Sequence, residues 1–407
     1  MSSIEELRAE FPQLSVKVYN KPLVYLDNAA TSLRPRSVIA KWEEMSSKYS
    51  ANLHRAIHAI ANRATEEFEN ARIATARFIG ASSEKEIIFT SGTTQALNLV
   101  AYSLGEMKNF LRPGDEIIIG EAEHHSNILP WQLLAERKSL KIKVLPVDEN
   151  GYLRIEELPS LVSDRTKLCC IAHISNVLGI INPVREISDY CRKRGVLTVM
   201  DGAQGVVHCE VDVKALGADF YAFSGHKLYA ASGTGVLWGR KELLDRMPPY
   251  MGGGEMISSV KWSESSFAPV PQKFEAGTQN MAGVPTLSPA FKWAEKFREY
   301  PELEGIKHYL LETLPQIEGL RLFGKPLKIE DKIPLFSLAV KGAHHEDLAL
   351  ILDKMGIAVR SGQMCAEPLM ERYGVTGMIR ASFAPYNTQE EAEYFVKSLQ
   401  KALKMLK

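Results

Sequence analysis

Two reactive side chains and one polar segment lie just after apolar runs of the kind that form strands. Lys227 follows DFYAFSGH, where burying its charge is costly unless the amine is paired, neutralised or covalently used. An amine in this position can form a Schiff base with an aldehyde. Asp201 follows LTVM, and the SGTT segment at 91–94 follows EIIFT and precedes a helix-like stretch. Taken singly, such an aspartate most often caps a turn, and a threonine at a helix start is usually an N-cap.

Together the three segments favour one cofactor, pyridoxal 5'-phosphate (PLP). Free backbone amides at a helix start, with Thr93 and Thr94, suit a phosphate group. The Asp201 carboxylate can hold a pyridine nitrogen protonated, and Lys227 can form the imine. A freed lysine amine can then move the Cα proton of an amino acid. We therefore predict a PLP site at the carboxyl ends of the strands, where open α/β sheets bind ligands.

Cys365 lies in the segment RSGQMCAEPLM and is one of five cysteines in the chain. Cys169 and Cys170 are adjacent in a strand-like run and should point to opposite faces, and the other two are isolated. The spacing predicts neither a disulfide framework nor a CxxC metal site. The glycine and the proline near Cys365 suit a loop that swings over a site. This segment alone leaves open whether Cys365 is a buried filler or a nucleophile.

Two histidine pairs are candidate metal ligands because of their close spacing in the sequence. His124 and His125 are adjacent, so they make a poor metal pair and read, by themselves, as a polar turn at a strand end. His54 and His58 are spaced i, i+4 and could bind a metal if the segment were helical. No third ligand is apparent, and we predict no metal site.

Seven short apolar runs predict the strands that position these residues. Most of them lack strict polar alternation, which is typical of buried strands in a largely parallel sheet. The runs lie at 86–91, 116–121, 141–148, 167–175, 197–201, 219–225 and 235–239. Helix-like segments separate them, so the pattern indicates an α/β fold. Residues 251–280 have little periodicity and are predicted to form long loops crossing a site.

Length and composition limit the architecture and the partners. A chain of 407 residues is expected to form one large domain (21–290) and a smaller α+β domain (1–20 and 291–407). Lys+Arg and Asp+Glu each number 49, so no strongly basic field favours nucleic acid or an anionic membrane. The N-terminal residues do not resemble a signal peptide, and no apolar run approaches the roughly 18 residues of a membrane span. We expect a cytoplasmic location.

Eleven motifs occur in the order found in one family of PLP enzymes. They are YLDNAATS, NLHRAIH, FTSGTTQALNLVA, EHHSNILPW, ISNVLG, DGAQ, FSGHKLY, GGGEMI, EAGTQN, RSGQMCAEP and IRAS. Through them, nearly the whole chain resembles the class V, fold-type I PLP enzymes, and among these the SufS-like second group of cysteine desulfurases. The resemblance implies a large domain with a mostly parallel seven-stranded sheet flanked by helices, plus a smaller C-terminal α+β domain. It also implies a homodimer.

The resemblance assigns a role to each motif residue. Lys227 would hold PLP as an imine, with His124 stacked over the pyridine ring, and both would be catalytic together with Cys365. Asp201 would pair with the ring nitrogen and Gln204 with the phenolic oxygen. Other implied contacts are Thr93, Thr94, Ser224 and His226 to the phosphate, Thr278 to the phosphate from the partner subunit, Asn176 to cofactor and substrate, and Arg360 and Arg380 to the substrate carboxylate. Both arginines follow short apolar runs, which favours partial burial over surface ion pairs.

The activity implied by the resemblance is conversion of L-cysteine to L-alanine. Cys365 would take the sulfur as a persulfide for a sulfur-acceptor protein, with iron–sulfur cluster assembly as the expected destination. Alternatives are a selenocysteine lyase, another class V lyase or epimerase, and a sulfur carrier without catalysis. The sequence departs from the family pattern twice. Gln363 and Met364 precede Cys365 where second-group members usually have His directly before the cysteine, and LYAASGTG follows Lys227 where Gly-Pro-Thr is commoner.

Overall fold

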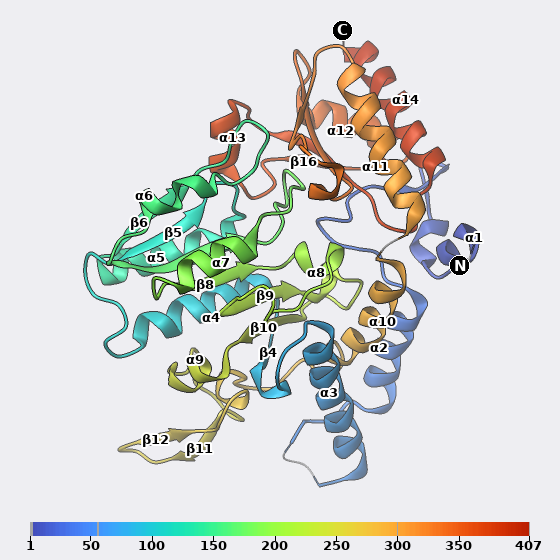
Figure 1. Cartoon of the computed structure of the whole chain (residues 1–407). Helices are drawn as coiled ribbons and strands as arrows, with labels where there is room; N and C mark the ends of the chain where they lie inside the picture. Colours follow the sequence, from blue (N-terminus) through green and yellow to red (C-terminus); the bar gives the residue numbers. More distant parts are fainter. Residues whose placement is uncertain (1–2, 55–56, 299, 407) are drawn as a thin grey trace.

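A seven-stranded sheet forms the centre of the protein, which is described here by a computed structural model covering residues 3–54, 57–298 and 300–406 (Figure 1). The strand order is β4-β10-β9-β8-β7-β5-β6. The strands are β4 (Ile87–Thr90), β5 (Glu116–Gly120), β6 (Lys141–Leu145), β7 (Thr166–Ala172), β8 (Leu197–Asp201), β9 (Phe220–Ser224) and β10 (Gly235–Gly239). Strands β5 to β9 pair in parallel, whereas β10 is antiparallel to both neighbours. Each predicted run forms one of these strands, which confirms the mostly parallel sheet.

Helices cover both faces of this sheet and bury separate cores. One core receives α4 (Thr93–Glu106), α5 (Leu129–Lys138) and α9 (Lys241–Arg246). The larger core receives α2 (Arg36–Lys48), α3 (Ala59–Phe78), α7 (Val184–Arg192), α8 (Gly205–His208) and α10 (Leu287–Phe297). Cys169 packs in the larger core and Cys170 in the other, so these adjacent cysteines do point to opposite faces. Apolar residues on both faces explain why the strands show no polar alternation.

The C-terminal part of the chain builds a second, antiparallel sheet at one end of the molecule (Figure 1). Its order is β13 (Leu320–Phe323), β14 (Leu335–Val340), β17 (Met378–Ser382) and β16 (Arg360–Gly362). It packs in a core of its own with α11 (Pro301–Thr313), α12 (His345–Lys354) and α14 (Gln389–Leu406). This is the predicted α+β module, although the sequence pattern did not predict β13.

Two segments join this module to the rest of the protein. Strand β3 (Val24–Tyr25) pairs in parallel with β15 (Ile357–Ala358), and Val24 lies in the core of the C-terminal module. In the other direction, α13 (Glu367–Tyr373) contributes Leu369 and Met370 to the larger core of the central sheet. Residues 360–370 therefore run from the C-terminal sheet, which they join through β16, to the larger core of the central sheet, which they join through α13. The domain boundaries at 21 and 290 stay a prediction.

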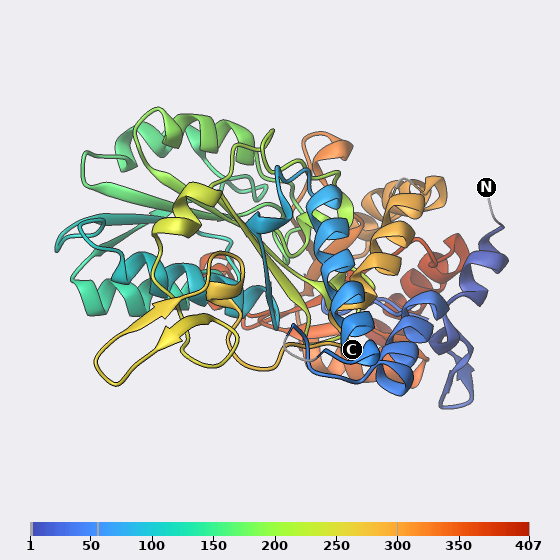
Figure 2. The same cartoon turned by 90° about the horizontal axis from the view of Figure 1, so that it is seen from below.

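The 251–280 segment differs from the predicted long loops. It contains a hairpin of β11 (Ile257–Val260) and β12 (Ser265–Phe267), which extends away from the body of the protein (Figure 2). Its strands are exposed, and Trp262 at the turn is fully exposed. A strand pair without a buried face carries no hydrophobic alternation, which explains why the sequence pattern does not reveal it.

The remaining elements are short, and they include the N-terminal helix. They are α1 (Ile4–Ala9), β1 (Lys17–Val18), β2 (Lys21–Pro22) and α6 (Leu158–Leu161). Among the described residues, no helix is long and apolar enough to cross a membrane. His54 precedes α3 with a φ of 63° and His58 is the N-cap of α3, so this pair does not share a helix. The described ranges contain no group of three or more His, Cys, Asp or Glu side chains arranged to hold a metal ion.

Candidate active site

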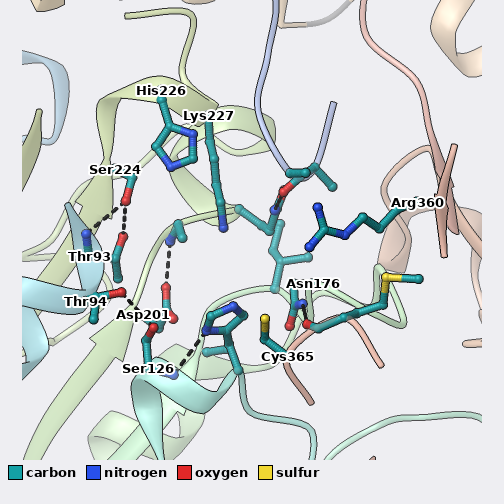
Figure 3. Close-up of a pocket in the computed structure, with 18 of the residues that line it drawn as sticks. Thr93, Thr94, Ser126, Asn176, Asp201, Ser224, His226, Lys227, Arg360 and Cys365 are labelled. Carbon is teal, nitrogen blue, oxygen red and sulfur yellow. Dashed lines mark hydrogen bonds between the residues drawn. The ribbon is translucent and has the colours of Figure 1, made fainter. Parts of the chain in front are cut away.

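A cavity of about 240 Å³ lies at the carboxyl ends of the central strands (Figure 3). It is lined by every predicted site residue except Thr278, namely Thr93, Thr94, His124, Asn176, Asp201, Ser224, Gln204, His226, Lys227, Arg360, Cys365 and Arg380. Thr278 is exposed and lies outside this lining, and its contact from a partner subunit stays a prediction. Sequence reasoning assigned no role to Ser126, Ala203 or Met364, which also line the cavity.

Hydroxyl groups gather in the cavity at the start of α4. The Thr93 N–H donates to Ser224 Oγ at 2.8 Å, and the Thr93 and Ser224 hydroxyls are 2.8 Å apart. Thr94 Oγ1 lies 2.7 Å from Ser126 Oγ. The first N–H groups of a helix have no partner within the helix, and its dipole favours negative charge there. Hydroxyls and free amides together suit a phosphate group.

Lys227 and Asp201 occupy the centre of the cavity and face one another across it (Figure 3). Burial lowers the pKa of Lys227, and the nearby Asp201 carboxylate partly opposes this shift. Burial also raises the pKa of Asp201, against the attraction of Lys227 and the Ala203 N–H, which donates to Asp201 Oδ1 at 2.9 Å. A lysine with a lowered pKa has more of the neutral amine, which is the form that attacks an aldehyde or accepts a proton.

The N-terminal segment closes one side of the cavity and orients two of the predicted residues. Gln204 Nε2 donates to the Ala29 carbonyl at 2.8 Å, and His226 Nδ1 lies 3.3 Å from Thr31 Oγ1. Burial and the neighbouring Lys227 lower the pKa of His226 to about 4. His226 is therefore neutral near pH 7 and acts as a hydrogen-bonding group rather than as a charge.

His124 is fixed in one orientation by the turn that follows β5. Its Nδ1 accepts a hydrogen bond from the Ser126 N–H at 3.1 Å, which leaves the proton on Nε2. Burial and Lys227 lower the pKa of His124 to about 4. A flat, neutral and oriented ring lining the cavity fits the predicted stacking role.

Glu123 supports this turn from behind the cavity. Its Oε1 accepts from the Ala172 N–H at 2.9 Å and its Oε2 from Asn127 Nδ2 at 2.6 Å. The carboxyl group therefore ties the end of β5 to the end of β7. Burial raises the pKa of Glu123 to about 8 despite the two donors. In the sequence, the only sign of this role of Glu123 is its position beside two histidines after an apolar run.

The raised pKa of Glu123 should make stability depend on pH. Between its usual pKa of 4.5 and about 8, the folded protein keeps this proton while the unfolded chain has lost it. The free energy of unfolding contributed by this group therefore falls as pH rises through that window. We expect the melting temperature of the native protein, relative to that of Glu123→Gln, to drop by several degrees between about pH 5.5 and about pH 8.5. A difference that is the same at both pH values would show that Glu123 is ionised throughout.

Arg380 lines the cavity from β17. Its Nη1 donates to the Asn176 carbonyl at 2.8 Å, and its Nη2 lies 3.3 Å from Asp27 Oδ1. Its Nε is a buried donor with no partner among the described residues. Arg360 is paired with Arg380 across β16 and β17 and lines the same cavity. Two guanidinium groups with a free donor suit a carboxylate. Asp27, within the YLDNAATS motif, was not singled out from the sequence.

Cys365 reaches the cavity on a loop that is tied to the central sheet. Asn176 Nδ2 donates to the Met364 carbonyl at 2.9 Å, and the His125 N–H donates to the Cys365 carbonyl at 2.7 Å. Met364 and Cys365 have φ values of 54° and 55°, a left-handed conformation that costs about 1–2 kcal/mol per residue without glycine. The thiol is exposed, whereas Met364 is buried. The expected swinging loop is thus an anchored one, because its backbone groups find partners at the ends of β5 and β7.

The chain matches the class V aminotransferase model over residues 24–395, and it belongs to that family. Its relatives include a probable cysteine desulfurase of Vibrio cholerae, 42% identical over all of both chains, and a cysteine desulfurase of Serratia proteamaculans, 44% identical over 99% of each. Among solved structures, the S-sulfonic acid form of cysteine desulfurase CsdA from Escherichia coli has a TM-score of 0.90 at 36% identity, over 100% of this chain and 99% of that one. The apo cysteine desulfurase of Thermococcus onnurineus has a TM-score of 0.93, also at 36% identity, with the same coverage. The predicted fold class and the resemblance to cysteine desulfurases are confirmed.

Proposed function

We propose that this protein is a PLP-dependent cysteine desulfurase that forms L-alanine from L-cysteine and takes the sulfur on Cys365. The observation that carries the proposal is the meeting of three groups in one cavity. These are the Lys227 amine, the Arg380 Nε, which has no partner within the described part of the chain, and the Cys365 thiol. An amino acid held between them has its carboxylate, its Cα and its side chain each beside a group that can act on it.

The residues present fit PLP. The α4 start with Thr93 and Ser224 would hold the phosphate, Lys227 would attach the cofactor covalently, and Asp201 would keep the ring nitrogen protonated. Gln204 would contact the phenolic oxygen and His124 would cover the ring. When bound, PLP supplies an electron-poor ring that stabilises negative charge at the Cα of an amino acid.

Substrate binding, proton transfer and sulfur capture would then be carried out by separate side chains of the protein. Arg380, held by the Asn176 carbonyl and Asp27, would bind the substrate carboxylate and fix its orientation. The neutral amine of Lys227 would take the Cα proton. The Cys365 thiolate would attack the substrate sulfur, so that an S–S bond forms as the C–S bond breaks and the carbon gains a proton. One cysteine and one enzyme thiol thus yield one alanine and one enzyme persulfide.

We also propose a destination for the sulfur and an oligomeric state for the enzyme. The persulfide passes to a sulfur-acceptor protein, with iron–sulfur cluster assembly in the cytoplasm as its destination. The active form is a homodimer in which Thr278 of one subunit serves the phosphate site of the other. The exposed position of Thr278 outside its own cavity is consistent with that arrangement.

Incubation with PLP, L-cysteine and a reductant tests the proposal. We expect alanine and sulfide in equal amounts, because each turnover yields one alanine and one persulfide that the reductant releases as sulfide. Both products should be measured in the same reaction. Pyruvate in place of alanine would indicate a β-elimination lyase and would overturn the proposed function.

A further inference from the structure

We propose that His125 is a positioning residue that holds the Cys365 loop in place for sulfur capture. This inference rests on the proposed function and deepens it. His125 follows the ring-covering His124 but forms its hydrogen bonds to the loop of the C-terminal module instead. Because His124 and His125 are adjacent, His125 connects the turn that carries His124 to the loop that carries Cys365.

His125 makes two hydrogen bonds that bracket the thiol. Its backbone N–H donates to the Cys365 carbonyl at 2.7 Å, and its Nε2 accepts from the Glu367 N–H at 3.0 Å. Accepting at Nε2 requires the neutral ring with its proton on Nδ1. The Glu367 amide begins α13 and has no partner within that helix, so the imidazole satisfies a group that would otherwise be open.

The loop needs such support because its backbone is unfavourable. Met364 and Cys365 are consecutive non-glycine residues in the left-handed region, and residues in this conformation persist only where their surroundings over-determine it. Asn176 holds the Met364 carbonyl on one side. His125 holds the residues on the other side. The direction of the Cα–Cβ bond of Cys365 follows from this backbone, so the contacts limit the positions that its thiol can reach by side-chain rotation.

The turn that carries His125 is itself rigidly placed. Glu123 ties it to β7, and the His124 ring is fixed by the Ser126 N–H. Loss of the His125 imidazole should therefore leave His124 and the rest of the cavity in place while it loosens residues 364–367. The expected defect lies in sulfur capture rather than in the binding of cofactor or substrate.

Two substitutions and one control separate this role from a general effect on folding. His125→Phe keeps an aromatic ring but removes the acceptor, and His125→Gln keeps an acceptor on a side chain of similar reach. His344→Phe is the matched control, because His344 also accepts a backbone N–H at a helix start, from Glu346 at 3.4 Å, but lies outside the cavity.

Single-turnover formation of persulfide on Cys365 is the main measurement. We expect His125→Phe to lower its rate at least about tenfold, since small misplacements of reacting groups cost one to two orders of magnitude. The KM for L-cysteine and the absorbance of bound PLP should stay unchanged. His125→Gln should recover most of the rate, and His344→Phe should match the native protein. A native rate in His125→Phe would overturn the proposal, as would a loss that follows only the loss of bound PLP.

Hydrogen exchange of the peptide covering residues 360–370 tests the hydrogen bond between His125 and Glu367 without an activity measurement. We expect faster exchange at Glu367 in His125→Phe than in the native protein or in His125→Gln. Unchanged exchange would contradict the proposed support. If the native protein forms no persulfide at all, the proposed function fails, and this comparison still decides whether His125 holds the loop.

Discussion

Replacing Lys227 with alanine is expected to lower the rate of alanine formation from L-cysteine by at least about 1,000-fold. Lys227 has two tasks in the proposed reaction, because its amine attaches PLP and also moves the Cα proton. The ionisable groups that act on its pKa are Asp201, Arg380 and Cys365. In the proposed reaction Asp201 pairs with the ring nitrogen, Arg380 binds the substrate carboxylate and Cys365 takes the sulfur, so none of them replaces the lysine amine. The rate should be measured with PLP in excess, so that weaker retention of the cofactor does not account for the loss.

Lys325→Ala is a suitable control for this variant, because Lys325 is an exposed lysine outside the cavity. It should retain the native rate. A Lys227→Ala protein that works within about tenfold of the native rate would remove Lys227 from the proton transfer, since general acid–base catalysis contributes about 100- to 10,000-fold.

Cys365→Ser is expected to reduce alanine and sulfide formation from L-cysteine by at least about 100-fold. A serine hydroxyl is a far weaker nucleophile than a thiolate at neutral pH, so the substrate sulfur has no acceptor. The loss should affect turnover and not the binding of L-cysteine, because the carboxylate-binding arginines are untouched. Single-turnover measurements of alanine formation, with enzyme in excess over L-cysteine, separate these two effects.

Cys209→Ser provides the matched control, because Cys209 is the other cysteine that is not fully buried and it lies outside the cavity. It should behave like the native protein. If Cys365→Ser still releases sulfide from L-cysteine at the native rate, the persulfide route is wrong. Retained activity on selenocysteine alone would instead favour the selenocysteine lyase alternative, since selenium leaves more easily than sulfur.

The parts of the fold and site that sequence reasoning predicted share a simple local signal. Six of the seven central strands are runs buried on both faces, and β6 is the partly exposed one. Asp201 ends β8, and Lys227 follows β9. Because the carboxyl ends of parallel strands meet at one edge of the sheet, residues far apart in the chain could be placed together. The roles of individual residues came from the family resemblance and not from this geometry.

The parts that were not predicted depend on tertiary contacts without a local signal. Glu123 matters through the backbone amide of Ala172, and Asp27 matters through Arg380, some 350 residues away in sequence. The left-handed pair at 364 and 365 contains no glycine, so nothing in the segment marked the backbone as fixed rather than mobile. The hairpin at 257–267 has no buried face and therefore no periodicity to detect.

The anchored loop limits how the proposed Cys365 persulfide could transfer its sulfur. The backbone is held on both sides of residue 365. In the proposed reaction, the terminal sulfur of a persulfide on Cys365 would therefore move by rotation of that side chain and not by movement of the loop. A sulfur-acceptor protein of the proposed kind would therefore have to bring its own thiol to Cys365, which is exposed. We expect the interval between turnovers to be set by how often such a recipient arrives, so that throughput rises in proportion to its concentration until docking saturates.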